Sequence, residues 1–155
     1  MKQIFAHPRL LKTLLNCWPP FWGAGIRIEQ LGPDYRFCRV ALSLRWWNKN
    51  ANRTQYGGSL FSMTDPVYSM LLMGILGEGY YIWDRAASIT FIRPGQGRVF
   101  ADIHLSQERL DEILNATQDG HKHFPQFRIN IVDEEGRLIA EVERTLYVRK
   151  KQASR

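Results

Sequence analysis

The chain has 155 residues, of which 45% are hydrophobic, 23% charged and 12% aromatic. A chain of this length fits one domain and can bury a core without disulfide or metal cross-links. Its net charge of +6 favours an anionic partner, such as nucleic acid, a membrane surface or a phosphorylated cofactor, although part of the excess falls in a basic C-terminal tail at about residues 149–155.

No targeting or membrane-spanning segment is expected. Residues 1–8 contain no apolar core of the kind that a signal peptide requires. The longest apolar stretch, residues 67–76, is far shorter than the ~20 residues of a spanning helix. Cys17 and Cys38 lie in no metal-binding or redox spacing, which predicts two reduced, packed thiols. These features together predict a cytoplasmic protein.

The N-terminal third of the chain predicts a short helix and a hairpin. Residues 8–17 form an amphipathic pattern that begins at a proline suited to a first helical turn, and two prolines at 19–20 end it. Residues 26–31 and 35–44 predict two strands joined by the turn at 32–34. Alternating apolar residues in the second strand indicate that one of its faces is buried.

Residues 57–77 predict a buried helix, because the segment is apolar, too long for a strand and without a strand's alternation. Val67 and Leu71 lie on one helical face and Leu72 on another, so the helix is apolar on nearly all sides. We expect one helix from about residue 59 to 76, bent near Pro66, because proline lacks the N–H that continues the helical hydrogen bonds.

The remaining chain predicts four strands and one surface helix. Strands are expected at residues 85–93 and 98–105, which flank a turn at 94–97, and at 124–132 and 138–148, which form a hairpin around 133–136. A helix is expected at 107–117, with Ser106 as its cap. Six strands bury one helix only by curling around it, since a flat sheet leaves its sides exposed. We therefore expect an α+β fold with an antiparallel sheet wrapped around a central helix.

The segment from Asn50 to Asp65 resembles the start of the central helix in hot-dog thioesterases. That family has an Asn, then a His-Gly-Gly triplet, and an acidic residue nine positions after the His. Gly57 and Gly58 match the two glycines, and Asp65 falls at the acidic position. The upstream Asn is matched by Asn50, with Asn52 as a rival.

The resemblance spans about residues 26–148 and is greatest to a poorly characterised thioesterase-like branch, in which an aromatic residue replaces the His, as Tyr56 does here. It implies a single hot-dog domain over residues 1–155. It also implies an acyl-CoA or acyl-carrier thioester as the substrate, coenzyme A only as part of that substrate, and no metal. The family's sites form between subunits, which implies a homodimer or a homotetramer built as a dimer of dimers.

The matching residues suggest a chemistry. Two glycines at a helix start permit close backbone approach, and the first-turn N–H groups of Gly57 and Gly58 have no intrahelical partners. The positive helix end would polarise a thioester carbonyl and stabilise its oxyanion. Asp65 would act as a general base on water or attack the carbonyl itself. Asn50 would orient water or substrate, and Tyr56 offers a hydroxyl, or only bulk, where the family has a ring N–H.

Further substrate contacts are expected from polar residues around the helix start. Ser62 and Ser69 share the helix face of the acidic residue, at i−3 and i+4, and Thr54 lies just before the glycines. Arg53 and Arg93 are expected at the rim, where they would bind the phosphates of coenzyme A.

Other interpretations of these residues stay open at this point. Asp65 followed by proline is also a typical helix start, with the Asp as N-cap, and Gly57 and Gly58 are compatible with an ordinary loop. Tyr56 in place of the His favours a second function, a non-catalytic module that binds acyl thioesters. A dehydratase on the same fold would need the His base, and a nucleic-acid binder is the most distant alternative.

Three other groups of residues predict no site. His121 and His123 offer two metal ligands with no third placed near them, and His104 lies on the polar face of its strand. Trp46 and Trp47 are suited to stacking on nucleic-acid bases, but an aromatic pair at a strand end is more typical of a core or an interface. The sequence contains no phosphate-binding glycine loop and no Ser-centred nucleophile elbow.

Overall fold

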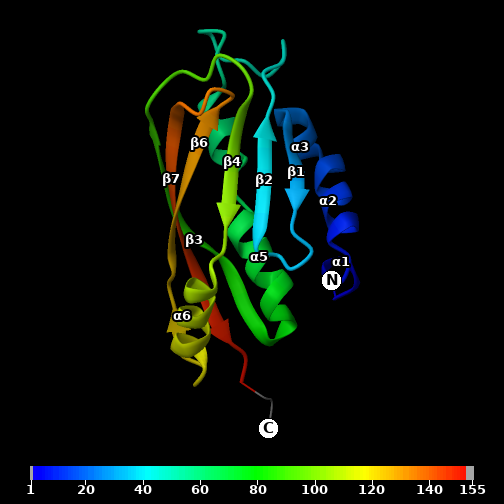
Figure 1. Cartoon of the computed structure of the whole chain (residues 1–155), viewed down its shortest axis with the longest axis vertical. Coiled ribbons are helices and arrows are strands. Elements are labelled where there is room, and N and C mark those ends of the chain that lie inside the picture. The colour runs from blue at the N-terminus through cyan, green and yellow to red at the C-terminus, as the bar shows by residue number, and fades with distance from the viewer. Residues whose placement is uncertain (1, 153–155) are drawn as a thin grey trace.

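The computed structural model describes residues 2–152, with side chains from Ile4 onward. The helices are α1 (Lys2–Phe5), α2 (Pro8–Cys17), α3 (Pro19–Ala24), α4 (Gly57–Ser62), α5 (Val67–Leu76), the 3₁₀ turn η1 (Gly77–Gly79) and α6 (Gln107–Thr117). The strands are β1 (Ile26–Leu31), β2 (Phe37–Leu42), β3 (Tyr80–Phe91), β4 (Val99–His104), β5 (Lys122–His123), β6 (Gln126–Asp133) and β7 (Leu138–Lys150). In Figure 1 the sheet runs along the length of the molecule, with α5 behind it and α1–α3 along one side.

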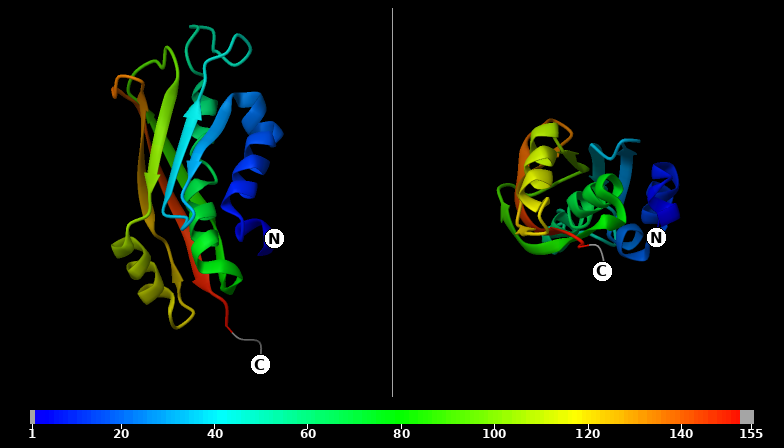
Figure 2. Two further views of the ribbon diagram at one scale, coloured as in Figure 1. Left: turned by 45° about the vertical axis from the view of Figure 1, so that its right-hand side comes forward. Right: turned by 90° about the horizontal axis from the view of Figure 1, so that it is seen from below.

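The sheet is antiparallel throughout and curls around the central helix. Its strand order is β1-β2-β4-β6-β7-β3, and the two-residue β5 pairs with β7. The view from below in Figure 2 shows the strands curving around α5. Six long antiparallel strands around one helix confirm the predicted fold, since the wrap buries the helix on most sides.

The central helix supplies much of the core. Together α4, α5 and η1 form a 23-residue helical stretch, Gly57–Gly79, that is by length and composition apolar enough to cross a membrane. In this fold the stretch is the buried core helix, and Val67, Leu71 and Leu72 are completely inaccessible. Each such side chain contributes about 1.5–3 kcal/mol through burial.

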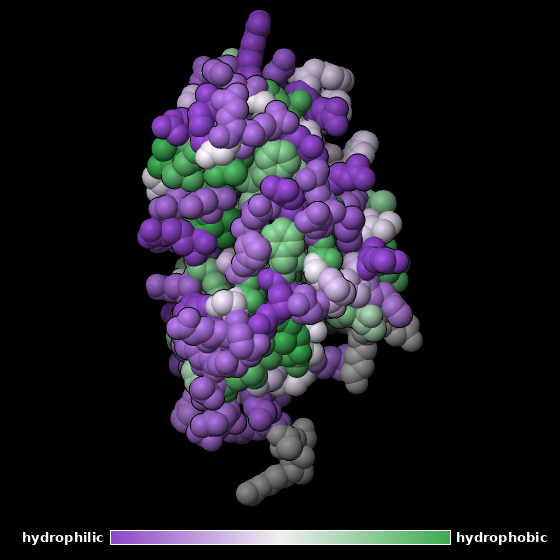
Figure 3. Space-filling model, viewed as in Figure 1, coloured by the Kyte–Doolittle hydropathy of each residue, from purple (hydrophilic) through white to green (hydrophobic). Residues whose placement is uncertain are grey.

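The strands alternate between the helix and solvent as the sequence predicts. Along β7, Val142, Leu146 and Val148 point to the helix and are fully buried. The outer face of the sheet is largely hydrophilic, with scattered apolar side chains, as Figure 3 shows. Two charged residues break this rule, because Arg144 on β7, only 2% exposed, and Asp84 on β3 occupy inward positions.

The two edges of the sheet differ. At β1, the side-chain amide of Asn16 donates to the carbonyl of Ile28 (3.0 Å) and accepts from its N–H (2.7 Å), as a neighbouring strand would. Lys12 donates to the carbonyl of Glu29 (2.7 Å). No backbone or side-chain group within residues 2–152 bonds the outer edge of β3, which pairs with β7 on its other side. Helix α2 therefore closes one edge, and the chain itself leaves the other open.

Several element boundaries differ from the predictions. The prolines at 19–20 begin α3 instead of only ending α2, since proline also fits a first helical turn. The central helix stops near residue 76 as predicted, with Gly77 at a φ of 63° that suits glycine, but strand β3 begins at Tyr80, well before the predicted residue 85. The short elements α1 and β5 were not predicted.

Two predictions about the chain ends and cysteines need correction. Strand β7 continues to Lys150, where it pairs with β3, so the tail predicted from residue 149 begins later. Residues 153–155 of that tail lie outside the described part. Both cysteines are free thiols, but Cys17 is exposed at the end of α2, so only Cys38 is packed. Burial raises the pKa of Cys38 to about 12.

Candidate active site

The central helix is broken between α4 and α5. Pro66 has no backbone N–H, so the carbonyl of Ser62 accepts from the N–H of Asp65 (3.1 Å) and the carbonyl of Phe61 from that of Thr64 (3.3 Å). These shorter-range bonds tighten the turn and separate the two helices. The bend confirms the prediction drawn from the proline, and it leaves 63% of the Asp65 side chain exposed.

Asp65 does not cap α5. The N-cap residue of α5 is Pro66, and no side chain accepts a hydrogen bond at that helix end. The N-cap interpretation of Asp65 is therefore wrong. Its Oδ1 instead faces a cation, Nη1 of Arg144, at 3.8 Å.

Arg144 is the buried charge at the centre of the break. Its Nε donates to Oγ1 of Thr64 (3.2 Å) and its Nη2 to the carbonyl of Phe61 (3.1 Å). Its Nη1 lies 3.4 Å from Oδ1 of Asp84 on β3, as well as 3.8 Å from Asp65. The planar guanidinium thus satisfies groups around the break and contacts two carboxylates at once, which a lysine cannot reproduce.

Asp84 is the second carboxylate of this cluster, and it is only 23% exposed. The hydroxyl of Ser69 donates to its Oδ2 (2.7 Å). Burial raises the pKa of Asp84, while the hydrogen bond from Ser69 and the charge of Arg144 act in the opposite direction. Two carboxylates share one cation, so the cluster carries a net negative charge when both are ionised.

Arg144 and Asp84 are the residues that sequence reasoning missed. Both stand at inward positions of their strands, Arg144 between Val142 and Leu146, and Asp84 after Ile82. A charge in the buried register of a strand is unusual without a partner. The sequence therefore does carry a signal for Arg144, which is a charged residue at a position of β7 that the alternation predicts to be buried.

Gly57 and Gly58 open α4, with Tyr56 as the N-cap residue. The N–H groups of Ser59 and Leu60 donate to the carbonyl of Tyr56 (3.0 and 3.1 Å). Across residues 2–152, no protein group accepts a hydrogen bond from the N–H of either glycine. The glycines therefore start a helix and do not belong to an ordinary loop, and they leave two unbonded donors.

Aromatic rings pack against both glycines. A Cβ added to Gly57 would lie 2.9 Å from the ring of Phe91, and one added to Gly58 would lie 2.4 Å from the ring of Tyr56. Both rings are more than half exposed, which makes this helix start an aromatic-lined surface. The close approach is a structural reason for glycine that operates beside any chemical one.

The helix start lies at one end of α4, and Asp65 lies beyond the other end. Gly58 and Asp65 are separated by seven residues of the helical stretch. At the 1.5 Å rise of an α-helix, that spacing corresponds to about 10 Å along the axis. This separation favours a site in which the two groups come from different subunits.

The loop before α4 uses the side chains of Asn50 and Thr54 for its own structure. The amide of Asn50 donates to Oγ1 of Thr54 (3.0 Å) and to the carbonyl of Gln55 (3.2 Å). Its Oδ1 accepts from the N–H groups of Asn52 and Thr54 (3.0 and 3.1 Å). These bonds fix the loop, and the roles predicted for Asn50 and Thr54 toward substrate stay predictions.

The other predicted contacts are dispersed. Ser62 is exposed, whereas Ser69 is buried and its hydroxyl donates to Asp84. Arg53 is exposed at a positive φ of 60°. Arg93 is exposed, and its Nη1 donates to a backbone carbonyl of β7 (3.4 Å). The structure brings Ser69 to the cluster and places both arginines outside it.

The histidines form no metal site. His123 lies 3.2 Å from Glu112, and His104 is exposed with its ring 4.6 Å from that of Phe37. No group of three His, Cys, Asp or Glu side chains suited to a metal occurs in the described part of the chain.

Comparisons with known proteins agree with this fold. Residues 7–148 match the family described as "Domain of unknown function (DUF4442)". No curated protein matches the chain in sequence. A Pseudomonas aeruginosa protein described as a probable thioesterase is 21% identical with a TM-score of 0.82, over 92% of this chain and 95% of that one.

Two further solved structures are more distant. A thioesterase from Haemophilus influenzae is 17% identical with a TM-score of 0.68, over 96% of this chain and 95% of that one. The PaaI protein from the phenylacetic acid degradation operon of E. coli is 17% identical with a TM-score of 0.62, over 96% of each chain. These structures share the fold of the chain, and the match over residues 7–148 shows that the chain is a member of the DUF4442 family.

Proposed function

We propose that the protein is an acyl-CoA thioesterase-like hydrolase in which Asp65 is the general base or the nucleophile. The observation that carries this proposal is the exposed carboxylate of Asp65, held in the break of the central helix next to the buried Arg144. A carboxylate suits either role. The likeness to two proteins described as a probable thioesterase and a thioesterase supports the choice of substrate.

A homodimer paired along β3 would complete the site. The β1 edge is closed by Asn16, while β3 offers an unpaired edge of 12 residues. An open edge of this length favours pairing with another strand, and a two-fold axis would pair two copies of β3. In this dimer Asp65 of the partner subunit would approach the helix start at Gly57 and Gly58. A dimer of dimers is the expected higher assembly.

The proposed reaction is a hydrolysis. The N–H groups of Gly57 and Gly58 bind the thioester oxygen, and Asp65 of the partner subunit removes a proton from water as the water oxygen bonds to the carbonyl carbon. The C–S bond then breaks, and the thiolate takes up the proton, which gives a carboxylic acid and the free thiol. In the nucleophilic variant, the carboxylate of Asp65 bonds to the carbonyl carbon as the C–S bond breaks and the thiolate leaves, which gives a mixed anhydride. Water then hydrolyses the anhydride to the carboxylic acid and the free carboxylate of Asp65, and the proton released from water goes to the thiolate.

A second function, a non-catalytic acyl-thioester binding module, is favoured by two observations. Tyr56 stands where the hot-dog thioesterases that the chain resembles have a His. The side-chain amide of Asn50 is already hydrogen-bonded to groups of its own loop. Both reduce the groups available to position water, and neither affects the unbonded N–H groups of Gly57 and Gly58. Binding without turnover is the outcome that distinguishes this function.

The test is a panel of acyl-CoA thioesters, with release of free thiol as the readout. Wild type is compared with Asp65→Asn, which keeps the shape of the side chain, and with Asp119→Asn, a control at an exposed loop position. We expect the first variant to lose roughly 10²–10⁴ in rate and the control to match wild type.

Two other results would change the assignment. Micromolar binding of acyl-CoA without turnover would establish the binding module. If the protein neither binds nor cleaves any thioester in the panel, both functional assignments fail and only the description of the fold stands.

A further inference from the structure

A basic groove crosses the end of the sheet where β1 begins and β2 ends. It consists of two adjoining cavities of about 510 and 270 Å³ that share Arg27, Ser43 and Arg45. Trp22 and Trp47 line its outer end. The combined size is that of a typical small-molecule site.

The charge of the groove is uncompensated. No Asp or Glu lines either cavity, and neither Arg27 nor Arg45 has a carboxylate partner among residues 2–152. A third arginine, Arg98, also lines the groove but is neutralised by an ion pair with Glu29. Two free guanidinium groups beside one another favour a ligand with phosphate groups.

The aromatic end of the groove is held in place. Nε1 of Trp47 donates to the carbonyl of Gly23 (3.1 Å). The amide of Asn48 donates to the carbonyls of Ala24 and Ser43 (2.8 Å each), which ties the loop after β2 to α3. Trp22 is 71% exposed. The fixed ring of Trp47 and the accessible ring of Trp22 are suited to stacking on a planar base.

The inner end of the groove lies beside the segment that leads into the central helix. Gln96 and Gly97 line it, and the carbonyl of Gly97 accepts from Nε2 of Gln55 (2.8 Å). Gln55 directly precedes Tyr56, the N-cap residue of α4. Figure 1 shows the ends of β1 and β2, α3 and the loop after β3 gathered at this end of the molecule.

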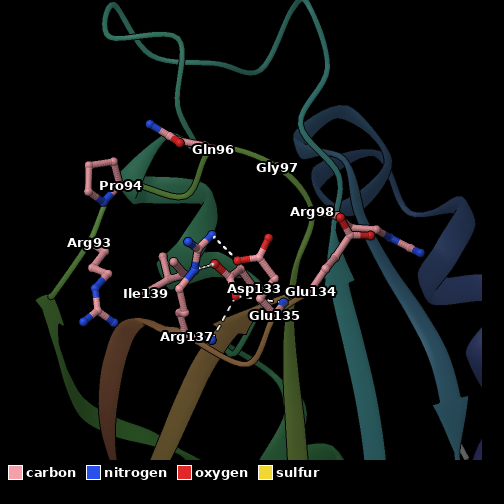
Figure 4. A pocket seen from close by; sticks show the side chains of 10 residues that line it. All are labelled: Arg93, Pro94, Gln96, Gly97, Arg98, Asp133, Glu134, Glu135, Arg137 and Ile139. Atoms are coloured by element: carbon pink, nitrogen blue, oxygen red, sulfur yellow. Dashed lines mark hydrogen bonds and ion pairs between the residues drawn. The ribbon is translucent and has the colours of Figure 1, made fainter.

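The cavity around Arg93 is a poorer anion site. Figure 4 shows that Arg93 shares it with Asp133, Glu134 and Glu135 of the β6–β7 turn, and that Arg137 is paired with Asp133. This cavity of about 400 Å³ is lined by three carboxylates and three arginines, so it has no excess of positive charge to bind a phosphate. This contrast separates Arg27 and Arg45 from Arg93, one of the two arginines expected from the sequence.

We propose that the groove binds the nucleotide part of coenzyme A, a phosphorylated adenosine diphosphate, with Arg27 and Arg45 on the phosphates and the indole rings on the adenine. The pantetheine arm passes Gln96 and Gly97 toward the helix start of the same subunit. That the ligand is coenzyme A, as part of a thioester substrate, rests on the proposed function. Binding of a phosphorylated adenosine can be tested without any hydrolysis.

The direct test is calorimetric titration of the full-length protein with adenosine 3′,5′-bisphosphate. We expect the double variant Arg27→Gln/Arg45→Gln to bind about ten-fold or more weakly, since it loses charge-assisted hydrogen bonds. The control Arg9→Gln/Lys122→Gln removes the same charge from exposed positions on α2 and β5 and should bind as wild type does. Trp22→Ala should weaken the bisphosphate but not inorganic pyrophosphate.

Kinetics separate failure of the groove from failure of the proposed function. The arginine variant should raise KM for acyl-CoA and leave kcat/KM unchanged for an acyl-N-acetylcysteamine thioester, which lacks the nucleotide. Bisphosphate binding that depends on the two arginines, without any hydrolysis, would uphold the groove and remove the hydrolase assignment. Unchanged bisphosphate affinity or unchanged KM in the arginine variant would overturn the groove, as would tighter binding of single-stranded RNA than of the bisphosphate.

Discussion

The two halves of the central helix are stabilised in different ways. Helix α5 buries an unbroken run of six residues, Val67–Leu72, most of them apolar. Helix α4 buries only Ser59 and Leu60, begins with two glycines, and ends against the guanidinium of Arg144. Apolar burial fixes the second half, whereas polar contacts and aromatic rings fix the first. The candidate chemistry lies in the first half and at the joint, residues 63–66 between α4 and α5, where backbone groups and the carboxylate of Asp65 stay accessible.

Replacing the charge at the joint should have the largest effect on stability. Arg144→Met leaves Asp84 without its cation and the carbonyl of Phe61 without the donor from β7. Removing one partner of a buried ion pair costs about 3–5 kcal/mol. Urea unfolding measures this loss. Arg144→Lys, which keeps the charge but not the several N–H donors of the planar guanidinium, should lose less unfolding free energy. A loss under about 1 kcal/mol for the Met variant would show that the cluster does not hold the joint.

The apolar half should respond strongly to a cavity, and the exposed half should not. Leu71→Ala in α5 removes a side chain with no exposed surface and should cost about 2–5 kcal/mol. Ser62→Ala in α4 changes an exposed residue and should stay within about 0.5 kcal/mol of wild type. Similar losses for the two variants in thermal and urea unfolding would contradict the division of the helix described above.

The sequence predicts the two halves unequally well. An apolar segment without alternation identifies α5, because composition alone shows that such a helix must be buried. The joint is less accessible to this reasoning, because Arg144 and Asp84 are 60 residues apart and meet only through the pairing of β7 with β3. The start of β3 was missed because Tyr81 and Trp83 are exposed aromatic residues, so the strand lacks a polar outer face there.

The pH dependence of stability should depend on Asp84. Burial raises the pKa of Asp84, so the folded protein binds its proton more tightly than the unfolded chain does. The stability contributed by that proton is fully present below the ordinary pKa of Asp, about 3.9, and is lost as pH rises through the raised value. Asp84→Asn should flatten this part of the curve of unfolding free energy against pH. A curve of the same shape in both proteins would assign the dependence to other groups.

A small loss is expected from replacing the proline itself. Pro66→Ala restores an N–H at the break, but Arg144 still bonds the carbonyl of Phe61 and Thr64. The variant should lose about 0.4–1 kcal/mol, because residue 66 regains freedom in the unfolded chain. A gain in stability on calorimetry would instead indicate that the proline alone imposes the break.

The central claim is that Asp65 of one subunit acts with the Gly57–Gly58 helix start of the other. Asp65→Asn keeps an intact helix start, and Gly58→Val keeps an intact Asp65 while placing a branched side chain against the ring of Tyr56. Each variant alone should be folded, dimeric and nearly inactive, as circular dichroism, sedimentation and thiol release would show.

The deciding measurement is thiol release from acyl-CoA by the two variants after they are unfolded and refolded together in equal amounts. Random pairing makes half of the dimers mixed, each with one complete site, so activity should recover to about a quarter of that of wild type. Activity no higher than that of the separate variants would contradict a site shared between subunits.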